Sequence, residues 1–175
     1  MTDLVVAHTS QVPPEDLAAG YRLMVLAFNN FDERDWDNAL GGLHVLVRDA
    51  GVLIGHAAIV QRHLVHRGRA LRTGYVEAVG VHPDAQRRGI GATMMATIED
   101  IAERAYDIGA LAASHAGVPL YESRGWQRWT GETAAMTPTG VRRSSDDERI
   151  YVMPFSVEMD LTGELLCDWR DGDLW

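Results

Sequence analysis

The chain has 175 residues, 46% of them hydrophobic, which is enough to bury the core of one globular domain. It contains no apolar run of about 18 residues and does not begin with a basic segment leading into an apolar one, so we expect a cytoplasmic protein without a membrane span or secretory signal. The net charge of −9 disfavours nucleic acid and anionic membranes as partners, and the one cysteine excludes an internal disulfide.

The first part of the chain predicts a strand, two helices and a β-hairpin. These elements cover residues 4–8 (strand), 15–28 and 32–40 (helices), and 43–48 and 52–62 (strands). The longer helix has apolar residues at helical spacing, and Gly41-Gly42 ends the shorter one. Asp49-Ala50-Gly51 joins the two later strands, and these turn-forming residues indicate a hairpin.

The second part of the chain predicts a long helix among further short strands. The elements cover residues 71–82 (strand), 83–88 (loop), 90–106 (amphipathic helix), 111–114 (buried strand), 118–124 (short helix), and 126–129 and 150–160 (strand-like segments). Ile90, Met94, Ile98 and Ile101 mark the apolar side of the long helix. Strands and helices in this order predict an α/β fold with helices packed around a mixed sheet.

The most informative segment joins the strand over 71–82 to the helix over 90–106. It reads Gln86-Arg87-Arg88-Gly89-Ile90-Gly91. Its glycines let backbone N–H groups approach a bulky anion, the helix N-terminus adds unpaired N–H groups and a favourable dipole, and the two arginines add positive charge. We therefore expect anion binding. The alternative is an ordinary glycine entry into a helix, because the spacing matches neither a Walker loop nor G-x-G-x-x-G.

This segment, together with the Val-x-Val strand before it, resembles the acetyl-CoA motif of the GNAT superfamily. The resemblance implies an α/β GNAT fold over residues 1–175 as a single domain, with a mixed, mostly antiparallel sheet flanked by helices. It also implies acetyl-CoA as co-substrate, with the pantetheine on the strand and the pyrophosphate in the turn. The expected acetyl-CoA-binding residues are Val79, Gly80, Val81, Gln86, Arg87, Arg88, Gly89, Ile90 and Gly91. Downstream, the segment 120–126 resembles the "LYxxxGF" segment of the superfamily, which implies that Tyr121 lies near the thioester sulfur.

Further segments resemble the mycobacterial aminoglycoside 2′-N-acetyltransferases. They are Asp35-Trp36, residues 40–44, 74–77 and 137–140, and the ending 167–175 with its terminal Trp175. The resemblance implies a homodimer and a polycationic aminoglycoside as substrate. The implied substrate-binding residues are Asn30, Asp35, Glu77, Ala78, Ala112, Asp146, Asp147, Asp173 and Trp175. Asn30 and Ala112 depart from that family, which has an acidic residue and a serine at these positions.

The distribution of charge agrees with a cationic substrate. Residues 146–175 carry nine acidic residues and two arginines, whereas residues 1–145 have a net charge of only −2. An acidic surface attracts cationic partners. Alternatively, the acidic residues only keep the protein soluble, Asp35 caps a short helix, and the segment 168–173 is a frayed tail. Trp169 and Trp175 argue against fraying, because aromatic side chains can dock on the protein.

The proposed chemistry needs a base and an acid. Glu77, two residues before the pantetheine strand, can take the proton from the attacking amine through a water, and the Trp175 carboxylate is the alternative base. Tyr121 can protonate the leaving thiolate, and the backbone N–H of Val79 can stabilise the oxyanion. Cys167 has no base partner, and the seven histidines lack metal-ligand spacing, so we expect no metal. The alternatives are an N-acetyltransferase for another cationic amine, such as a polyamine or an amino-sugar metabolite, and a non-catalytic acyl-CoA-binding module.

Overall fold

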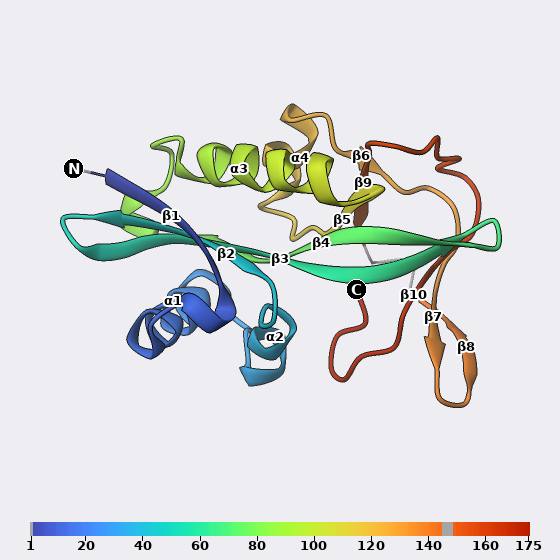
Figure 1. Cartoon of the computed structure of the whole chain (residues 1–175), viewed down its shortest axis with the longest axis horizontal. Helices are drawn as coiled ribbons and strands as arrows, with labels where there is room; N and C mark the ends of the chain where they lie inside the picture. Colours follow the sequence, from blue (N-terminus) through green and yellow to red (C-terminus); the bar gives the residue numbers. More distant parts are fainter. Residues whose placement is uncertain (1, 145–148) are drawn as a thin grey trace. The chain divides into compact units, whose positions relative to one another are not determined.

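The protein is described here by a computed structural model that covers residues 2–144 and 149–175. Its elements in chain order are β1 (Thr2–His8), α1 (Pro14–Ala27), α2 (Glu33–Asn38), β2 (Leu43–Asp49), β3 (Val52–His66), β4 (Arg69–Val81), α3 (Ile90–Ala105), β5 (Ile108–Ala112), α4 (Val118–Ser123), β6 (Gln127–Arg128), β7 (Thr133–Thr137), β8 (Gly140–Arg143), β9 (Ile150–Pro154) and β10 (Leu165–Cys167) (Figure 1). Short 3-10 turns cover Thr9–Gln11 and Pro83–Ala85. The order of strands and helices agrees with the α/β class expected from the sequence.

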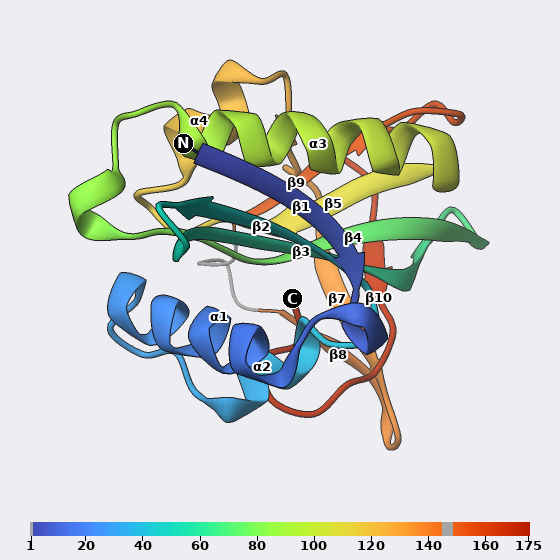
Figure 2. The same cartoon turned by 60° about the vertical axis from the view of Figure 1, so that its left-hand side comes forward.

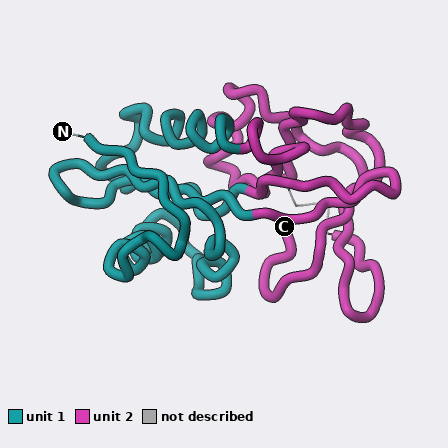
Figure 3. Tube along the Cα trace, viewed as in Figure 1, with its two compact units in different colours: residues 1–60, 76–101 teal, residues 61–75, 102–175 magenta. Residues whose placement is uncertain are grey.

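The chain forms two compact units (Figure 3). The first consists of residues 1–60 and 76–101, and the second of residues 61–75 and 102–175. Strands β3 and β4 are long enough to contribute residues to both units. Among the described residues, none of the helices combines the length and the apolar character that a membrane crossing requires.

The first unit is an antiparallel sheet with helices on both of its faces. Strand β1 pairs with β2, and β2 pairs with β3 across the expected hairpin, whose turn residues Ala50 and Gly51 both have positive φ. Helices α1 and α2 lie on one face of these strands, and the first part of α3 lies on the other (Figure 2). A side chain at Gly55 would come within 2.9 Å of Ile90, so the glycine in β3 lets α3 pack closely.

The second unit contains the parallel pairs of the mixed sheet. Strand β4 pairs in parallel with β5, which pairs antiparallel with β9, and β9 pairs with β6. Strand β10 pairs antiparallel with the end of β3 and in parallel with β7, which forms a hairpin with β8. The expected mixed and mostly antiparallel pairing is therefore present.

Several strand boundaries differ from the sequence predictions. The strand expected over 111–114 is β5 over Ile108–Ala112, because Gly109 lies inside the strand, where a side chain would come within 2.9 Å of the Trp126 ring. Strand β9 stops at Pro154 rather than near residue 160, since proline has no N–H for the ladder. Strands β7, β8 and β10 were not predicted. β8 and β10 have only four and three residues, too short for an alternating pattern to stand out.

Candidate active site

The turn between β4 and α3 has the backbone that the sequence indicated. Gly89 has φ +80° and Arg87 has φ +59°, so both lie in the left-handed region. The Gly89 carbonyl accepts the N–H of Thr93 at 3.0 Å and so starts α3, whose first-turn N–H groups have no partner within the helix. A Cβ atom at Gly89 would meet nothing within 4 Å. The turn thus offers backbone donors and open space to an anion, which fits a pyrophosphate.

The two arginines of the turn have different surroundings. Both are exposed, but Arg88 Nη2 donates to Asp49 Oδ2 at 3.0 Å, which ties the turn to the β2–β3 hairpin. The hydrogen bond from Arg88 holds the pKa of Asp49 below its usual value. Gln86 Nε2 donates to the Val81 carbonyl at 3.4 Å. Arg88 and Gln86 therefore help to shape the turn, a contribution that the sequence did not reveal.

Strand β4 is distorted just before the turn. Ala78 has φ +49°, a conformation that an L-residue with a Cβ rarely adopts, and it lies between Glu77 and Val79. Further on, Gly80 permits close packing by α1, because a Cβ there would come within 2.4 Å of Met24 Cε. The distortion lies next to the residues expected to bind pantetheine and to carry the base.

An apolar cluster connects the distorted strand with the loop before α2. It contains Met24 and Trp36, and Phe28, Phe31 and Ala78 pack against it. Asn30, which lies between Phe28 and Phe31 in the sequence, is exposed.

Asp35 lies five residues after Asn30, in the first turn of α2. It is half-buried, and its Oδ2 accepts the N–H of Asp32 at 3.0 Å in a capping box. The capping role considered for Asp35 is therefore present.

Tyr121 lies in α4, in the second unit. Its side chain is buried, and its ring packs edge-on against Trp126 with a centroid distance of 6.3 Å. Burial raises the pKa of Tyr121 well above its usual value, because a phenolate would lose its hydration. The phenol is neutral at physiological pH, as free tyrosine is, and its raised pKa makes it a weaker acid than free tyrosine.

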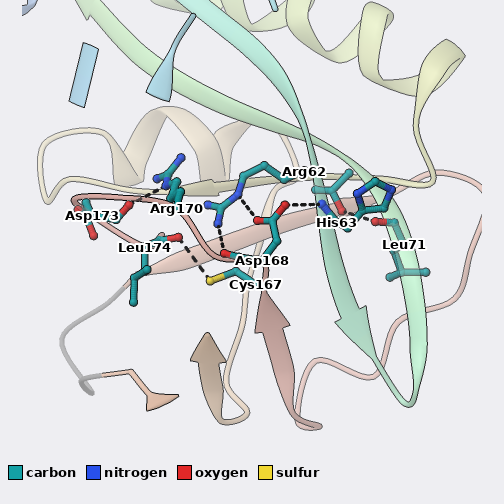
Figure 4. Close-up of polar contacts among 9 residues, drawn as sticks. Arg62, His63, Leu71, Cys167, Asp168, Arg170, Asp173 and Leu174 are labelled. Atoms are coloured by element: carbon teal, nitrogen blue, oxygen red, sulfur yellow. Dashed lines mark hydrogen bonds and ion pairs between the residues drawn. The ribbon is translucent and has the colours of Figure 1, made fainter. Parts of the chain in front are cut away.

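The carboxyl-terminal segment is anchored rather than frayed (Figure 4). Arg62 of β3 donates from Nε to Asp168 Oδ1 at 2.7 Å and from Nη2 to the Asp168 carbonyl at 2.9 Å. Arg170 Nε donates to the Asp173 carbonyl at 2.6 Å. Trp175 is 3% exposed, and its Nε1 donates to Ser144 Oγ at 2.6 Å. These contacts hold the chain terminus in a defined place.

Three side chains of this anchor, those of Arg62, Tyr75 and Arg170, were missed by the sequence predictions. The guanidinium groups of Arg62 and Arg170 lie over the Tyr75 ring, with their central carbons 4.7 and 5.4 Å from its centroid. No local pattern marks these residues, because residues 62, 75 and 170 are far apart in the chain. Burial raises the pKa of the neighbouring Cys167 to about 11, so its thiol stays protonated and is a poor nucleophile.

The remaining predicted residues lie in different surroundings. Ala112 is the exposed last residue of β5, and Asp173 is exposed in the loop before the buried end of the chain. Glu77 is half-buried on β4. Asp146 and Asp147 lie outside the described residues.

One of the histidines has a role that the sequence did not indicate. Nδ1 of His56 donates to the carbonyl of the distorted residue Ala78 at 2.8 Å.

Comparison with known proteins places the chain in a family. Residues 9–129 match the model of the acetyltransferase (GNAT) domain. The chain is 43% identical over 176 residues to the Aminoglycoside 2'-N-acetyltransferase of Mycolicibacterium fortuitum, covering 97% of this chain and 90% of that protein. The ribosomal-protein-S18-alanine N-acetyltransferase of Escherichia coli has the same fold, with a TM-score of 0.63, 22% identity, and coverage of 90% of this chain and 97% of that one. An acyl-CoA N-acyltransferase of Pseudomonas aeruginosa also has this fold, with a TM-score of 0.63, 16% identity, and coverage of 87% of this chain and 99% of that one. The chain therefore belongs to the GNAT superfamily of acetyltransferases and, within it, to the family of the aminoglycoside 2′-N-acetyltransferases.

Proposed function

We propose that the chain transfers the acetyl group of acetyl-CoA to an amino group of an aminoglycoside, with the 2′-amino group as the acceptor. The observation that carries this proposal is the 43% identity, over 97% of the chain, to the M. fortuitum Aminoglycoside 2'-N-acetyltransferase. The charge supports it independently, because residues 146–175 carry nine acidic residues and two arginines and an aminoglycoside is a polycation. Asp35, Asp173 and the terminal carboxylate are the proposed ammonium partners, together with Asp146 and Asp147.

The acetyl donor would bind to the first unit. The left-handed Arg87 and Gly89 turn the chain so that the N–H groups at the start of α3, which have no partner within the helix, can hold the pyrophosphate. Backbone groups of Val79, Gly80 and Val81, just after the distortion at Ala78, would pair with the pantetheine. The thioester supplies an activated acetyl group, and the residues of the chain position it and move protons.

The amine must lose a proton before it can attack, since most aminoglycoside amines are ammonium ions at neutral pH. Glu77 is the proposed base, acting through a water, because it precedes the distortion in the strand that would bind the donor. The Trp175 carboxylate is the competing base. The two are separated by Glu77→Gln and by a chain extended beyond Trp175: the variant that loses turnover but keeps acetyl-CoA affinity identifies the base.

The leaving thiolate must gain a proton, and Tyr121 is the proposed donor. Its phenol is neutral at physiological pH, as an acid requires, although burial raises its pKa and so makes it a weaker acid than free tyrosine. Tyr121→Phe preserves the ring packed against Trp126 and removes the hydroxyl. It should slow acetyl transfer without weakening acetyl-CoA binding.

The proposal is tested by following the release of the CoA thiol with a thiol reagent. Tobramycin, which has a 2′-amino group, is compared with the polyamine spermidine and with no amine. Fast release of the thiol with tobramycin, but not with spermidine or without an amine, supports the proposed function. Faster release with spermidine makes the chain a polyamine acetyltransferase. No release with either amine, with acetyl-CoA still binding by calorimetry, would contradict both the aminoglycoside and the polyamine and leave another amine or a non-catalytic acyl-CoA-binding module.

A further inference from the structure

A line of hydrogen bonds through two buried histidines ends on the distorted residue of β4. His56 Nδ1 contacts the Ala78 carbonyl at 2.8 Å, His56 Nε2 contacts His44 Nδ1 at 2.9 Å, and His44 Nε2 contacts Thr9 Oγ1 at 2.8 Å. The N–H of Gly41 donates to the same threonine oxygen at 2.8 Å. Both imidazoles are 0% exposed. The line thus connects the start of the chain, the hairpin and the proposed donor-binding strand within the first unit.

Only one arrangement of protons satisfies this line when both rings are neutral. A carbonyl can only accept, so His56 Nδ1 carries the proton and His56 Nε2 accepts. His44 Nδ1 must then donate, which leaves His44 Nε2 as the acceptor of the Thr9 hydroxyl proton. The Gly42 carbonyl, which accepts the Thr9 N–H at 2.9 Å, also lies 3.2 Å from that hydroxyl, but a proton donated there would leave His44 Nε2 without a donor. Each donor of the line is therefore used, and each donates to the next group in the direction of Ala78.

The rings have the neutral state that this arrangement requires. Burial lowers the pKa of both His44 and His56 to about 4, because an imidazolium would lose its hydration there. Trp36 packs against the His56 ring at a centroid distance of 5.0 Å and an angle of 46°. A side chain at Gly20 would come within 2.7 Å of the Trp36 ring, so α1 closes the site from outside. The pair is held by packing as well as by hydrogen bonds.

The end point of the line is a strained residue. A left-handed conformation at an L-residue such as Ala78 is unfavourable by about 1–2 kcal/mol and persists only where the surroundings enforce it. The bond from His56 to the Ala78 carbonyl fixes the peptide between residues 78 and 79. That peptide carries the N–H of Val79. On the other side of Ala78 lies Glu77, the proposed base.

We propose that Thr9, His44 and His56 form a positioning relay that holds Ala78 in its left-handed conformation and thereby orients Glu77 and the Val79 N–H for acetyl transfer. The effect on catalysis rests on the proposed function, whereas the relay itself does not. His44 and His56 are positioning residues, because they act through Ala78 and need not touch the substrate. The relay consists of residues 9, 44 and 56, and it fixes the geometry of the peptide between residues 78 and 79.

Two substitutions at His56 separate positioning from packing. In His56→Asn the side-chain nitrogen can occupy the place of Nδ1 and still donate to Ala78, but the contact with His44 is lost. In His56→Gln the side chain reaches the place of Nε2 toward His44, but the donor to Ala78 is lost. We expect both to lower stability. The kcat should fall about tenfold to a hundredfold in His56→Gln and by clearly less in His56→Asn, which keeps the donor to Ala78 but loses the support from His44 and Thr9, with smaller changes in KM. Equal losses of kcat in the two variants would mean that His56 only fills space, which would overturn its positioning role.

The outer end of the relay is tested in the same way. Thr9→Val removes the hydroxyl that donates to His44, whereas Thr9→Ser keeps it. We expect Thr9→Val to lower kcat by more than Thr9→Ser does. If the two variants have the same kcat, the relay ends at His44 and the proposed role of Thr9 is wrong.

The proton arrangement is read directly by nitrogen NMR of the imidazoles in the whole protein, without any substrate. At pH 7 we expect one proton on each ring, at Nδ1 in both, with the signals assigned from the spectra of His44→Asn and His56→Asn. A proton on Nε2 of His56 overturns the relay, whatever amine the enzyme acetylates. The expected tautomers together with no acetyl transfer to tobramycin would instead overturn the proposed function and leave the relay standing.

Discussion

Replacing Arg62 by methionine should destabilise the protein much more than the same change at Arg67. Both arginines pair with an aspartate, Asp168 and Asp160 respectively, and both pairs lie in the second unit. They differ in burial: the Arg62 side chain is 5% exposed, whereas that of Arg67 is 70% exposed. The two substitutions thus each remove an arginine–aspartate ion pair, one with a buried arginine and one with an exposed arginine.

The expected loss at Arg62 follows from its contacts. Methionine keeps much of the apolar volume but removes two charge-assisted hydrogen bonds to Asp168 and the contact with the Tyr75 ring, each worth about 1–3 kcal/mol. Two effects reduce the loss. Asp168 is 33% exposed and can regain water, and the buried Nη1 of Arg62, which has no hydrogen-bond partner within the described residues, disappears.

Together these effects should lower the free energy of unfolding of Arg62→Met by about 2 kcal/mol, which is less than the loss of about 3–5 kcal/mol for breaking a fully buried pair. It corresponds to a fall in Tm of about 4–8 °C for a chain of this length. For Arg67→Met the loss should stay below about 0.5 kcal/mol, as for other exposed pairs.

The assay is urea unfolding at pH 7.5, followed by circular dichroism and by tryptophan fluorescence. Because Arg62 holds the segment that ends at Trp175, its replacement should also raise the aminoglycoside KM while the affinity for acetyl-CoA is kept. Equal losses of stability in the two variants would refute the assignment of the Arg62 pair as the anchor of the tail.

The other predictions concern the donor turn, the base and the buried histidines. Gly89→Trp should abolish acetyl-CoA binding measured by calorimetry, whereas Gly68→Trp, at a turn glycine that also has positive φ and open space, should not; equal affinities would rule out the turn as the pyrophosphate site. Glu77→Gln should lower kcat by about 10²–10⁴-fold with the affinity for acetyl-CoA kept, and near-normal turnover would assign the base elsewhere. Because the folded-state pKa of His44 and His56 is about 4 and the unfolded value is 6.5, the unfolded chain binds more protons between these values. The free energy of unfolding should therefore be highest above pH 6.5 and fall by about 1.4 kcal/mol per pH unit for each histidine toward pH 4. A stability independent of pH between 6.5 and 4.5 would contradict the buried neutral pair.

The turn and its helix could be predicted because their signal is local. Strand, glycine turn and amphipathic helix follow one another between residues 71 and 106, and Gly89 has the positive φ that its position requires. The capping role of Asp35 was also visible, since its partner is only three residues away. These features need no knowledge of the tertiary structure.

The parts that were missed depend on contacts between distant residues. Arg62 and Asp168 are 106 positions apart, and Thr9 and His44 are 35 apart, so no sequence window contains both partners. The strain at Ala78 was invisible for a different reason. Alanine is not a residue that favours a left-handed conformation, and the cause lies in a side chain 22 positions earlier.

The central claim is tested most directly by determining where the acetyl group is attached. The enzyme is incubated with acetyl-CoA and either tobramycin, which has a 2′-amino group, or kanamycin A, which has a 2′-hydroxyl group, and the products are analysed by mass spectrometry and NMR. The account predicts one acetyl group on the 2′-nitrogen of tobramycin and no product from kanamycin A. Acetylation of kanamycin A as fast as of tobramycin, or attachment to another nitrogen of tobramycin, would contradict it.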